Sequence, residues 1–220
     1  MNKIAVSDLC AYYENRVIFK DMTFNVSEGD YLCITGENGS GKTTLMRLLL
    51  GFNVKHTGNI VFSDGAKRKI GWLSQDTAVR NDFPASVKEV VLSGFTGSNR
   101  LGIGYGKKQK QKALECMKKL NIEDLKDRAF NELSGGQRQR VRLCRCLVAD
   151  CDMLFLDEPV TGLDSTSACE MYATIKSLNA EGITVIMITH DISRARSDAK
   201  HILNISDDGY VFCDSKGDVK

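Results

Sequence analysis

Residues 36–43, with the sequence GENGSGKT, form a glycine-rich segment that ends in a lysine and a threonine. Glycines let successive backbone N–H groups turn inward around a phosphate, and the N-terminus of a following helix adds the positive end of its dipole. Lys42 supplies a mobile positive charge for the β- and γ-phosphates of a nucleotide, and the Thr43 hydroxyl is a candidate ligand for Mg²⁺. The spacing therefore predicts a phosphate-binding loop.

The alternative for this segment is a plain glycine-rich turn before a helix. An apolar strand pattern, YLCIT, runs directly into the segment, and an apolar helix pattern, LMRLLLGF, follows it. Strand, glycine loop and helix in this order favour the phosphate loop. The predicted nucleotide-binding residues of the loop are Gly36, Asn38, Gly39, Ser40, Gly41, Lys42, Thr43 and Thr44.

Two adjacent carboxylates, Asp157 and Glu158, follow the apolar run MLFL. Ligands bind at the carboxyl ends of strands in a parallel sheet, which would place Asp157 beside a Mg²⁺ ion held at the phosphate loop. Glu158 would project toward the γ-phosphate and hold or deprotonate an attacking water. An exposed acid pair in a loop is the alternative, and the presence of the phosphate loop favours the catalytic interpretation.

Between these motifs lies the segment Leu133-Ser134-Gly135-Gly136-Gln137. Together with the two nucleotide motifs, this LSGGQ segment resembles the signature of the ATP-binding-cassette (ABC) ATPases. The stretch between Lys42 and Leu133 has room for the helical subdomain of that family, but not for the coiled-coil insert of its chromosome and DNA-repair members. The resemblance covers essentially the whole chain and implies an enzyme that binds ATP with Mg²⁺ and hydrolyses it.

The signature segment is expected to open a helix at about Gly135, which creates a second anion-binding helix N-terminus. One ATP cannot fill two phosphate sites on one small lobe. The resemblance implies a two-fold, head-to-tail dimer with a second copy of the chain, in which each signature segment closes on the γ-phosphate held by the other. The resemblance also implies that the loop at Gly162-Leu163-Asp164 crosses the dimer interface. The residues assigned to ATP in this way are Ser134, Gly135, Gly136, Gln137 and Asp164.

Three further positions match the family one by one. Gln75, at a strand end, resembles the glutamine that contacts Mg²⁺ or water. His190, after ITVIMIT, resembles the histidine that touches the γ-phosphate; a structural histidine is the alternative, and its place at a strand end favours function. Tyr13 resembles the ring that stacks on adenine, although Tyr12 competes and core packing of either ring stays open. The resemblance thus implies Lys42, Gln75, Glu158 and His190 as catalytic residues and Thr43, Gln75 and Asp157 as Mg²⁺ ligands.

The hydrophobic pattern predicts the elements that must position these residues. KIAVSDL and RVIFKDMTFNV predict an antiparallel N-terminal sheet, and YLCIT, DMLFLDE, ITVIMIT and HILNIS predict strands that alternate with helices. The predicted fold class is α/β: a P-loop NTPase core with a mostly parallel sheet, an N-terminal antiparallel β subdomain and an inserted helical subdomain. We predict a single ABC ATPase domain over 1–220, with its core at 1–76 and 150–220 and the helical subdomain at about 77–149.

The composition excludes several other classes of protein. Thirty Lys and Arg against 28 Asp and Glu leave a formal charge of +2, which gives no basic field for nucleic acid. The lysines between positions 107 and 112 lie opposite an apolar stripe, which indicates the solvated face of one helix.

No stretch reaches the length of a signal-peptide core or a membrane span, so we expect a cytosolic chain. Its eight cysteines should stay reduced, and Cys144, Cys146 and Cys151 should be buried side chains, not metal ligands.

Softer similarity favours one branch of the family. Segment 82–94 and the run LNAEGITVIMITHDI followed by HILNI are similar to subunits that import zinc, manganese or chelated iron. The resemblance implies an ATPase docked under an integral membrane permease at the inner face of the cell membrane, with an extracytoplasmic metal-binding protein as indirect partner. The alternatives are a soluble ABC ATPase of iron–sulfur assembly or DNA association, an importer of another substrate, or a regulatory module without useful hydrolysis.

Overall fold

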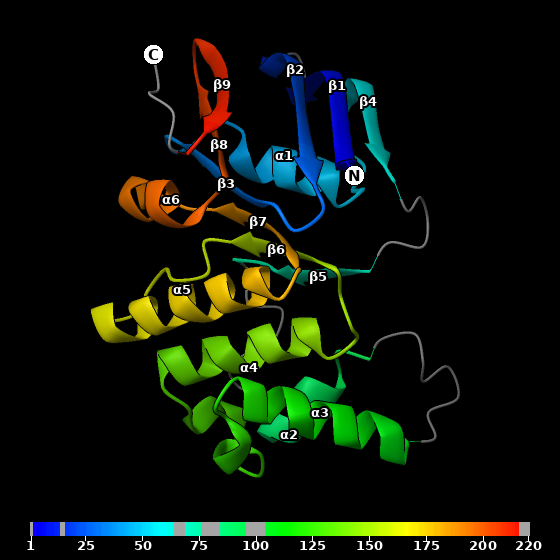
Figure 1. The fold of residues 1–220 in the computed structure, drawn as a ribbon, viewed down its shortest axis with the longest axis vertical. Helices are drawn as coiled ribbons and strands as arrows, with labels where there is room; N and C mark the ends of the chain where they lie inside the picture. Colours follow the sequence, from blue (N-terminus) through cyan, green and yellow to red (C-terminus); the bar gives the residue numbers. More distant parts are fainter. Residues whose placement is uncertain (1, 14–15, 64–68, 76–83, 96–103, 216–220) are drawn as a thin grey trace. The chain divides into compact units, whose positions relative to one another are not determined.

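The computed structural model describes residues 2–13, 16–63, 69–75, 84–95 and 104–215 (Figure 1). The chain clusters into two units. Unit 1 comprises Met1–Arg68, Phe155–Glu158 and Leu178–Lys220, and unit 2 comprises Lys69–Leu154 and Pro159–Ser177. Part of the importer-like segment 82–94 lies outside the described residues. The predicted limits of the core and the helical subdomain stay a prediction.

Unit 1 contains a three-stranded antiparallel sheet with the order β2-β1-β4. It consists of β1 (Asn2–Tyr13), β2 (Arg16–Ser27) and β4 (His56–Phe62). In β2 the side chains at positions 22, 24 and 26 are buried and those between them are exposed, as expected for a sheet with one face on the core. The predicted antiparallel N-terminal sheet is confirmed. Its third strand, β4, carries mostly exposed side chains, and the sequence pattern did not reveal it.

The second sheet includes, in order, β6 (Met153–Asp157), β7 (Thr184–Ile188), β3 (Tyr31–Gly36), β8 (His201–Ser206) and β9 (Gly209–Asp214). Unit 1 holds these strands from residue 155 of β6 onward. Strand β3 runs parallel to both β7 and β8, whereas β9 returns antiparallel to β8. Every residue of β6 and β7 is buried, which explains their continuous apolar runs. The helices α1 (Lys42–Leu49) and α6 (Ile192–Asp198) pack against β3. The predicted α/β fold with a mostly parallel sheet is confirmed.

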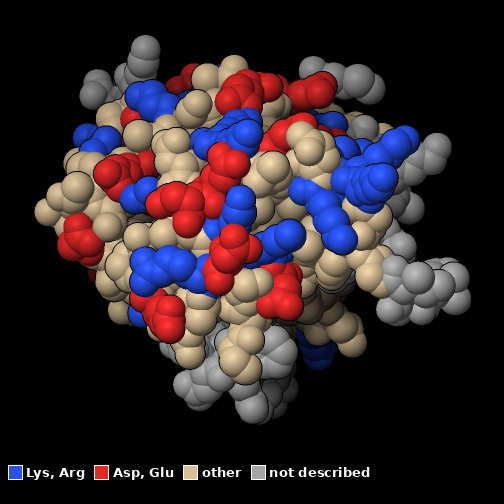
Figure 2. Space-filling model, turned by 90° about the horizontal axis from the view of Figure 1, so that it is seen from below, with Lys and Arg blue, Asp and Glu red and all other residues tan. Residues whose placement is uncertain are grey.

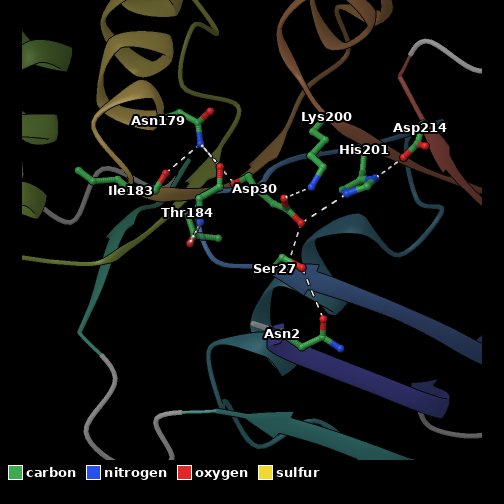
Figure 3. A network of polar contacts seen from close by, with 10 residues as sticks. Asn2, Ser27, Asp30, Asn179, Ile183, Thr184, Lys200, His201 and Asp214 are labelled. Atoms are coloured by element: carbon green, nitrogen blue, oxygen red, sulfur yellow. Dashed lines mark hydrogen bonds and ion pairs between the residues drawn. The ribbon is translucent and has the colours of Figure 1, made fainter.

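A buried carboxylate anchors the turn that leads into β3 (Figure 3). Asp30 is only 3 % exposed, and its Oδ2 accepts a hydrogen bond from the Ser27 N–H at 2.7 Å. Its Oδ1 accepts one from Lys200 Nζ at 2.6 Å. His201 lies between two carboxylates, with Nε2 3.4 Å from Asp30 Oδ2 and Nδ1 2.8 Å from Asp214 Oδ1. Asp30 therefore joins the start of β3 to the start of β8.

The same turn is joined to β7 by neutral hydrogen bonds. Asn179 Nδ2 donates to the carbonyl oxygens of Gly29 and Ile183, each at 2.9 Å, and the Gly29 N–H donates to Thr184 Oγ1 at 3.0 Å (Figure 3). Because β3 ends at the predicted phosphate loop, these contacts fix the base of the strand that carries the loop.

Asp30→Ala is expected to lower the free energy of unfolding by about 2–3 kcal/mol. The reason is that the Ser27 N–H, the Lys200 ammonium and the His201 imidazole lose the carboxylate that they contact. Urea denaturation of the purified chain measures this change. Asp214→Ala is the matched control, because it removes the carboxylate on the other side of His201. The Asp214 side chain is 74 % exposed, so its loss should lower the free energy of unfolding by about 1 kcal/mol or less. Equal losses for the two variants would contradict the anchoring role of Asp30.

Unit 2 contains β5 (Ile70–Leu73) and a group of helices. The α-helices are α2 (Val87–Leu92), α3 (Lys107–Lys119), α4 (Gly135–Leu147) and, up to residue 177, α5 (Ser165–Ala180). The short 3₁₀ turns are η2 (Glu123–Leu125) and η3 (Phe130–Glu132). Both α2 and α3 pack on α4. Helix α2 begins with a capping box, in which the Ser86 hydroxyl accepts from the Glu89 N–H and the Glu89 carboxylate accepts from the Ser86 N–H. The described residues of the predicted helical subdomain form helices, and the helix predicted to begin at about Gly135 is confirmed.

The lysine run lies on the exposed side of α3. Lys107, Lys108, Lys110 and Lys112 are exposed, whereas Ala113 and Met117 are buried, as predicted for a solvated helix face. On the face of the molecule that Figure 2 shows, Lys and Arg side chains interleave with Asp and Glu side chains. The charge pattern of this face is therefore mixed.

The cysteines form no disulfide in the structure. Cys144 is buried, and Cys146 and Cys151 are half-buried; burial raises the pKa of the Cys151 thiol to about 11. Among the described residues, no group of three or more His, Cys, Asp or Glu side chains has the arrangement of a metal site. In the described parts of the chain, no helix has the length and apolar character to cross a membrane.

Candidate nucleotide site

The predicted phosphate loop connects β3 to α1 in unit 1. Gly36 has φ +140°, and a Cβ at this position would lie 2.1 Å from the Ile205 carbonyl oxygen, so only glycine fits the close approach to β8. At Gly39, where φ is +84°, a Cβ would meet no described atom within 4 Å. The space on the Cβ side of Gly39 is therefore open.

Lys42, the first residue of α1, folds its side chain back over this loop. It is 6 % exposed, and its Nζ donates to the carbonyl oxygens of Gly36 at 3.0 Å and Glu37 at 2.7 Å. Burial lowers the pKa of the Lys42 ammonium, while the carboxylates of Glu158 and Asp157 act in the opposite direction. The structure thus brings the lysine and both predicted acids into electrostatic contact.

The hydroxyl groups of the loop also fit a phosphate with its metal ion. Ser40 Oγ is buried and has no hydrogen-bond partner among the described residues, so a ligand oxygen could satisfy it. Asn38 lies on the loop, Thr43 and Thr44 lie in the first turn of α1, and all three reach the surface at least partly. Hydroxyl and carboxylate oxygens are the donors that Mg²⁺ prefers, which fits Thr43 and Asp157.

The two predicted acids lie at the end of β6, where Asp157 is the last residue of the strand and Glu158 follows it. Asp157 is 6 % exposed, which excludes the alternative of an exposed acid pair in a loop. Glu158 has φ +50°, a left-handed conformation that is unusual for glutamate, and its N–H donates to the Ile188 carbonyl at 3.1 Å. Strained backbone of this kind is found mainly where the surrounding structure enforces it, often at active sites.

His190, which follows β7, contacts Glu158. Its Nε2 lies 2.7 Å from Glu158 Oε1, and the imidazole is more exposed than the carboxylate. The contact holds the glutamate side chain in one orientation, and the carboxylates of Glu158 and Asp157 both interact electrostatically with Lys42. The structure therefore brings together four predicted residues of unit 1, and a carboxylate so placed can accept a proton from a nearby water.

The signature segment lies in unit 2. Helix α4 begins at Gly135, as predicted, with Ser134 as its N-cap. The Ser134 hydroxyl accepts from the Gln137 N–H at 3.3 Å, and Gln137 Oε1 accepts from the Ser134 N–H at 3.1 Å, which makes a capping box. Gln137 thus serves the cap of its own helix, a role that the S-x-x-Q spacing could have revealed.

The remaining predicted residues lie at strand and helix ends. In unit 2, Gln75 is exposed just after β5, and Asp164 caps α5 by accepting from the Ser167 N–H at 3.0 Å. In unit 1, Tyr13 is 70 % exposed at the end of β1, which excludes core packing for this ring and leaves it available for stacking. Tyr12 is only half-exposed. Ser167 was not predicted from the sequence, because its role depends on contacts with Asp164 and α4.

Comparison with known proteins places the chain in a family. The profile of the ABC transporter family matches residues 19–161. The zinc uptake system ATP-binding protein ZurA of Listeria innocua is 35 % identical over 94 % of this chain and 84 % of its own length. The manganese transport system ATP-binding protein MntB of Halalkalibacterium halodurans is 32 % identical over 92 % of this chain and 82 % of its own length.

Solved structures agree with this relationship. A metal-chelate type ABC transporter in an inward-facing conformation is 29 % identical, with a TM-score of 0.89 over 98 % of this chain and 84 % of that one. The dimeric structure of a bacterial ABC transporter cassette is 26 % identical, with a TM-score of 0.79 over 98 % of this chain and 100 % of that one. With the phosphate loop, the acids after β6 and the signature helix in place, the chain belongs to the ABC transporter family as one of its ATP-binding cassettes.

Proposed function

We propose that this chain is the ATP-hydrolysing subunit of a transporter that imports zinc or manganese through a separate membrane permease. The observation that carries the catalytic part is the Glu158–His190 contact, together with the electrostatic interaction of Glu158 and Asp157 with Lys42. The zinc and manganese uptake proteins described above support the substrate, since this chain resembles them over more than nine-tenths of its length.

Each residue of unit 1 has a chemical task in this proposal. Lys42 exchanges its contacts with the Gly36 and Glu37 carbonyls for oxygens of the β- and γ-phosphates, and the loop N–H groups bind the same phosphates. Thr43 and Asp157 would hold Mg²⁺, which neutralises charge on the phosphates when it is bound. Glu158 orients a water and accepts its proton, and His190 holds the Glu158 carboxylate in place. Tyr13 stacks on the adenine.

The residues of unit 2 act on a second copy. The N-terminus of α4, at Ser134, Gly135 and Gly136, closes on the γ-phosphate bound by the partner copy, and the loop that ends at Asp164 crosses the interface. ATP binding then draws two copies together, and hydrolysis lets them separate. Gln75 contacts Mg²⁺ or water and transmits this motion to a permease, which holds the cassette at the cytoplasmic face of the membrane. An extracytoplasmic protein delivers the metal, and no nucleic acid is involved.

Co-expression with a metal-importer permease from the same genome tests the proposal. The two proteins should purify as one complex, and in proteoliposomes ATP should drive accumulation of radioactive zinc or manganese. The matched control is the same complex with Glu158→Gln, which should assemble and transport no metal. Purification with iron–sulfur assembly or DNA-bound proteins, and with no membrane protein, would contradict the importer function. ATP-dependent transport of another solute would contradict the metal substrate alone.

A further inference from the structure

The two glycines that open α4 have different surroundings. Gly136 is buried, and a Cβ there would lie 2.6 Å from Ser167 Oγ and 2.9 Å from Ser167 Cβ. Gly135 is exposed, and a Cβ there would make an ordinary contact of 3.5 Å with Leu163 Cδ2. The chain's own packing therefore requires glycine at position 136 but not at 135, and the residue that makes this demand is Ser167.

Ser167 also contacts the loop before α5. Its hydroxyl donates to Asp164 Oδ2 at 2.7 Å, and its N–H donates to Asp164 Oδ1 at 3.0 Å. Hydrogen bonds from the Ser167 N–H and then from its hydroxyl lower the pKa of the Asp164 carboxyl, so the exposed carboxylate stays ionised and oriented. One serine side chain thus contacts both segments that are proposed to meet the partner copy.

Other contacts hold the body of α4 to the same segment of unit 2. Gln139 Nε2 donates to the Pro159 carbonyl at 2.8 Å, and Arg140 forms an ion pair with Glu170. These contacts do not involve Ser167. Removing the Ser167 hydroxyl would therefore leave α4 docked and change only how firmly its first turn is set against Asp164.

We propose that Ser167 is a positioning residue that keeps the first turn of α4, at Ser134–Gly136, and the Asp164 carboxylate in one fixed arrangement, so that both reach the partner's nucleotide together. The inference rests on the proposed ATP-driven dimer. It assigns different tasks to the two glycines: Gly136 receives Ser167 within its own chain, and Gly135 leaves backbone open toward the partner copy.

The first test introduces Ser167→Ala into Glu158→Gln, the variant expected to stay ATP-bound. Loss of one hydrogen bond to a charged acceptor should weaken ATP-driven dimerisation by about 10-fold. Light scattering over a series of protein concentrations measures this change. Binding of a fluorescent ATP analogue to the dilute single copy and the thermal midpoint should not change, because the phosphate loop is untouched. Thr174→Ala is the matched control, because the Thr174 hydroxyl donates to the Glu170 carbonyl within α5, and its loss should leave dimerisation unaltered.

The second test adds a methyl group at position 136 and removes the side chain at position 167. Gly136→Ala should prevent ATP-driven dimerisation, and adding Ser167→Gly should restore it to the level of Ser167→Ala, because the next atom, the Cα of residue 167, lies 4.0 Å from the new methyl group. A Cβ at position 135 does not meet Ser167, so adding Ser167→Gly to Gly135→Ala should not improve dimerisation.

The outcomes separate the two proposals. A Glu158→Gln parent that stays monomeric with ATP would contradict the proposed function and this inference with it. A parent that dimerises, with Ser167→Ala dimerising equally well, would overturn the positioning role of Ser167 alone. A Gly136→Ala/Ser167→Gly pair that dimerises no better than Gly136→Ala would also overturn that role.

Discussion

Glu158→Gln is expected to lower ATP turnover by about two to four orders of magnitude while ATP binding persists. The amide keeps the size of the side chain and can still contact His190, but it cannot accept a proton from the attacking water. Because the backbone at Glu158 is held by the Ile188 carbonyl, the substitution should leave the strand end in place. Phosphate release in the steady state measures turnover, and equilibrium binding of a fluorescent ATP analogue measures affinity.

Glu115→Gln is the control for this substitution, because it makes the same chemical change on the exposed side of α3 and should leave turnover unaltered. A Glu158→Gln variant that hydrolyses ATP at close to the parental rate would remove Glu158 from the role of catalytic base. A variant that loses ATP binding as well would indicate that the carboxylate holds the loop through its influence on Lys42 and acts first in binding.

Lys42→Ala should weaken ATP binding by about 10- to 100-fold, the loss expected for charge-assisted hydrogen bonds to a phosphate. The Lys42 ammonium lies within the loop, and its contacts with the Gly36 and Glu37 carbonyls show that it can reach the centre of the turn. Titration calorimetry with ATP and Mg²⁺ gives the affinity. The thermal midpoint without nucleotide shows whether the variant remains folded.

Lys20→Ala removes an exposed lysine from β2 in the same unit and serves as the control, with no expected change in ATP affinity. If Lys42→Ala bound ATP as tightly as the parent, the lysine would not be the phosphate ligand. The predicted arrangement of the loop around a triphosphate would then be wrong, even though Gly36 and Gly39 have the conformations that it needs.

Local patterns made much of the fold predictable. The alternation in β1 and β2 and the continuous apolar runs of β3, β6 and β7 each reflect the burial of one element, so they are visible in a short window of sequence. Strand β4 has no such window, because its side chains are mostly exposed. It pairs with β1 through backbone hydrogen bonds, which leave little trace in residue type.

By itself, the sequence determined which chemical groups the site can use: the glycine-rich loop with its lysine, the acids after an apolar strand and the signature before a helix, because chain neighbours supply these motifs. Only the tertiary structure decided that His190 contacts Glu158, that Asp30 anchors β3 to β8 and that Ser167 fills the space over Gly136. These contacts join residues that are distant in the chain, and their partners are selected by how strands and helices pack, not by spacing along the sequence.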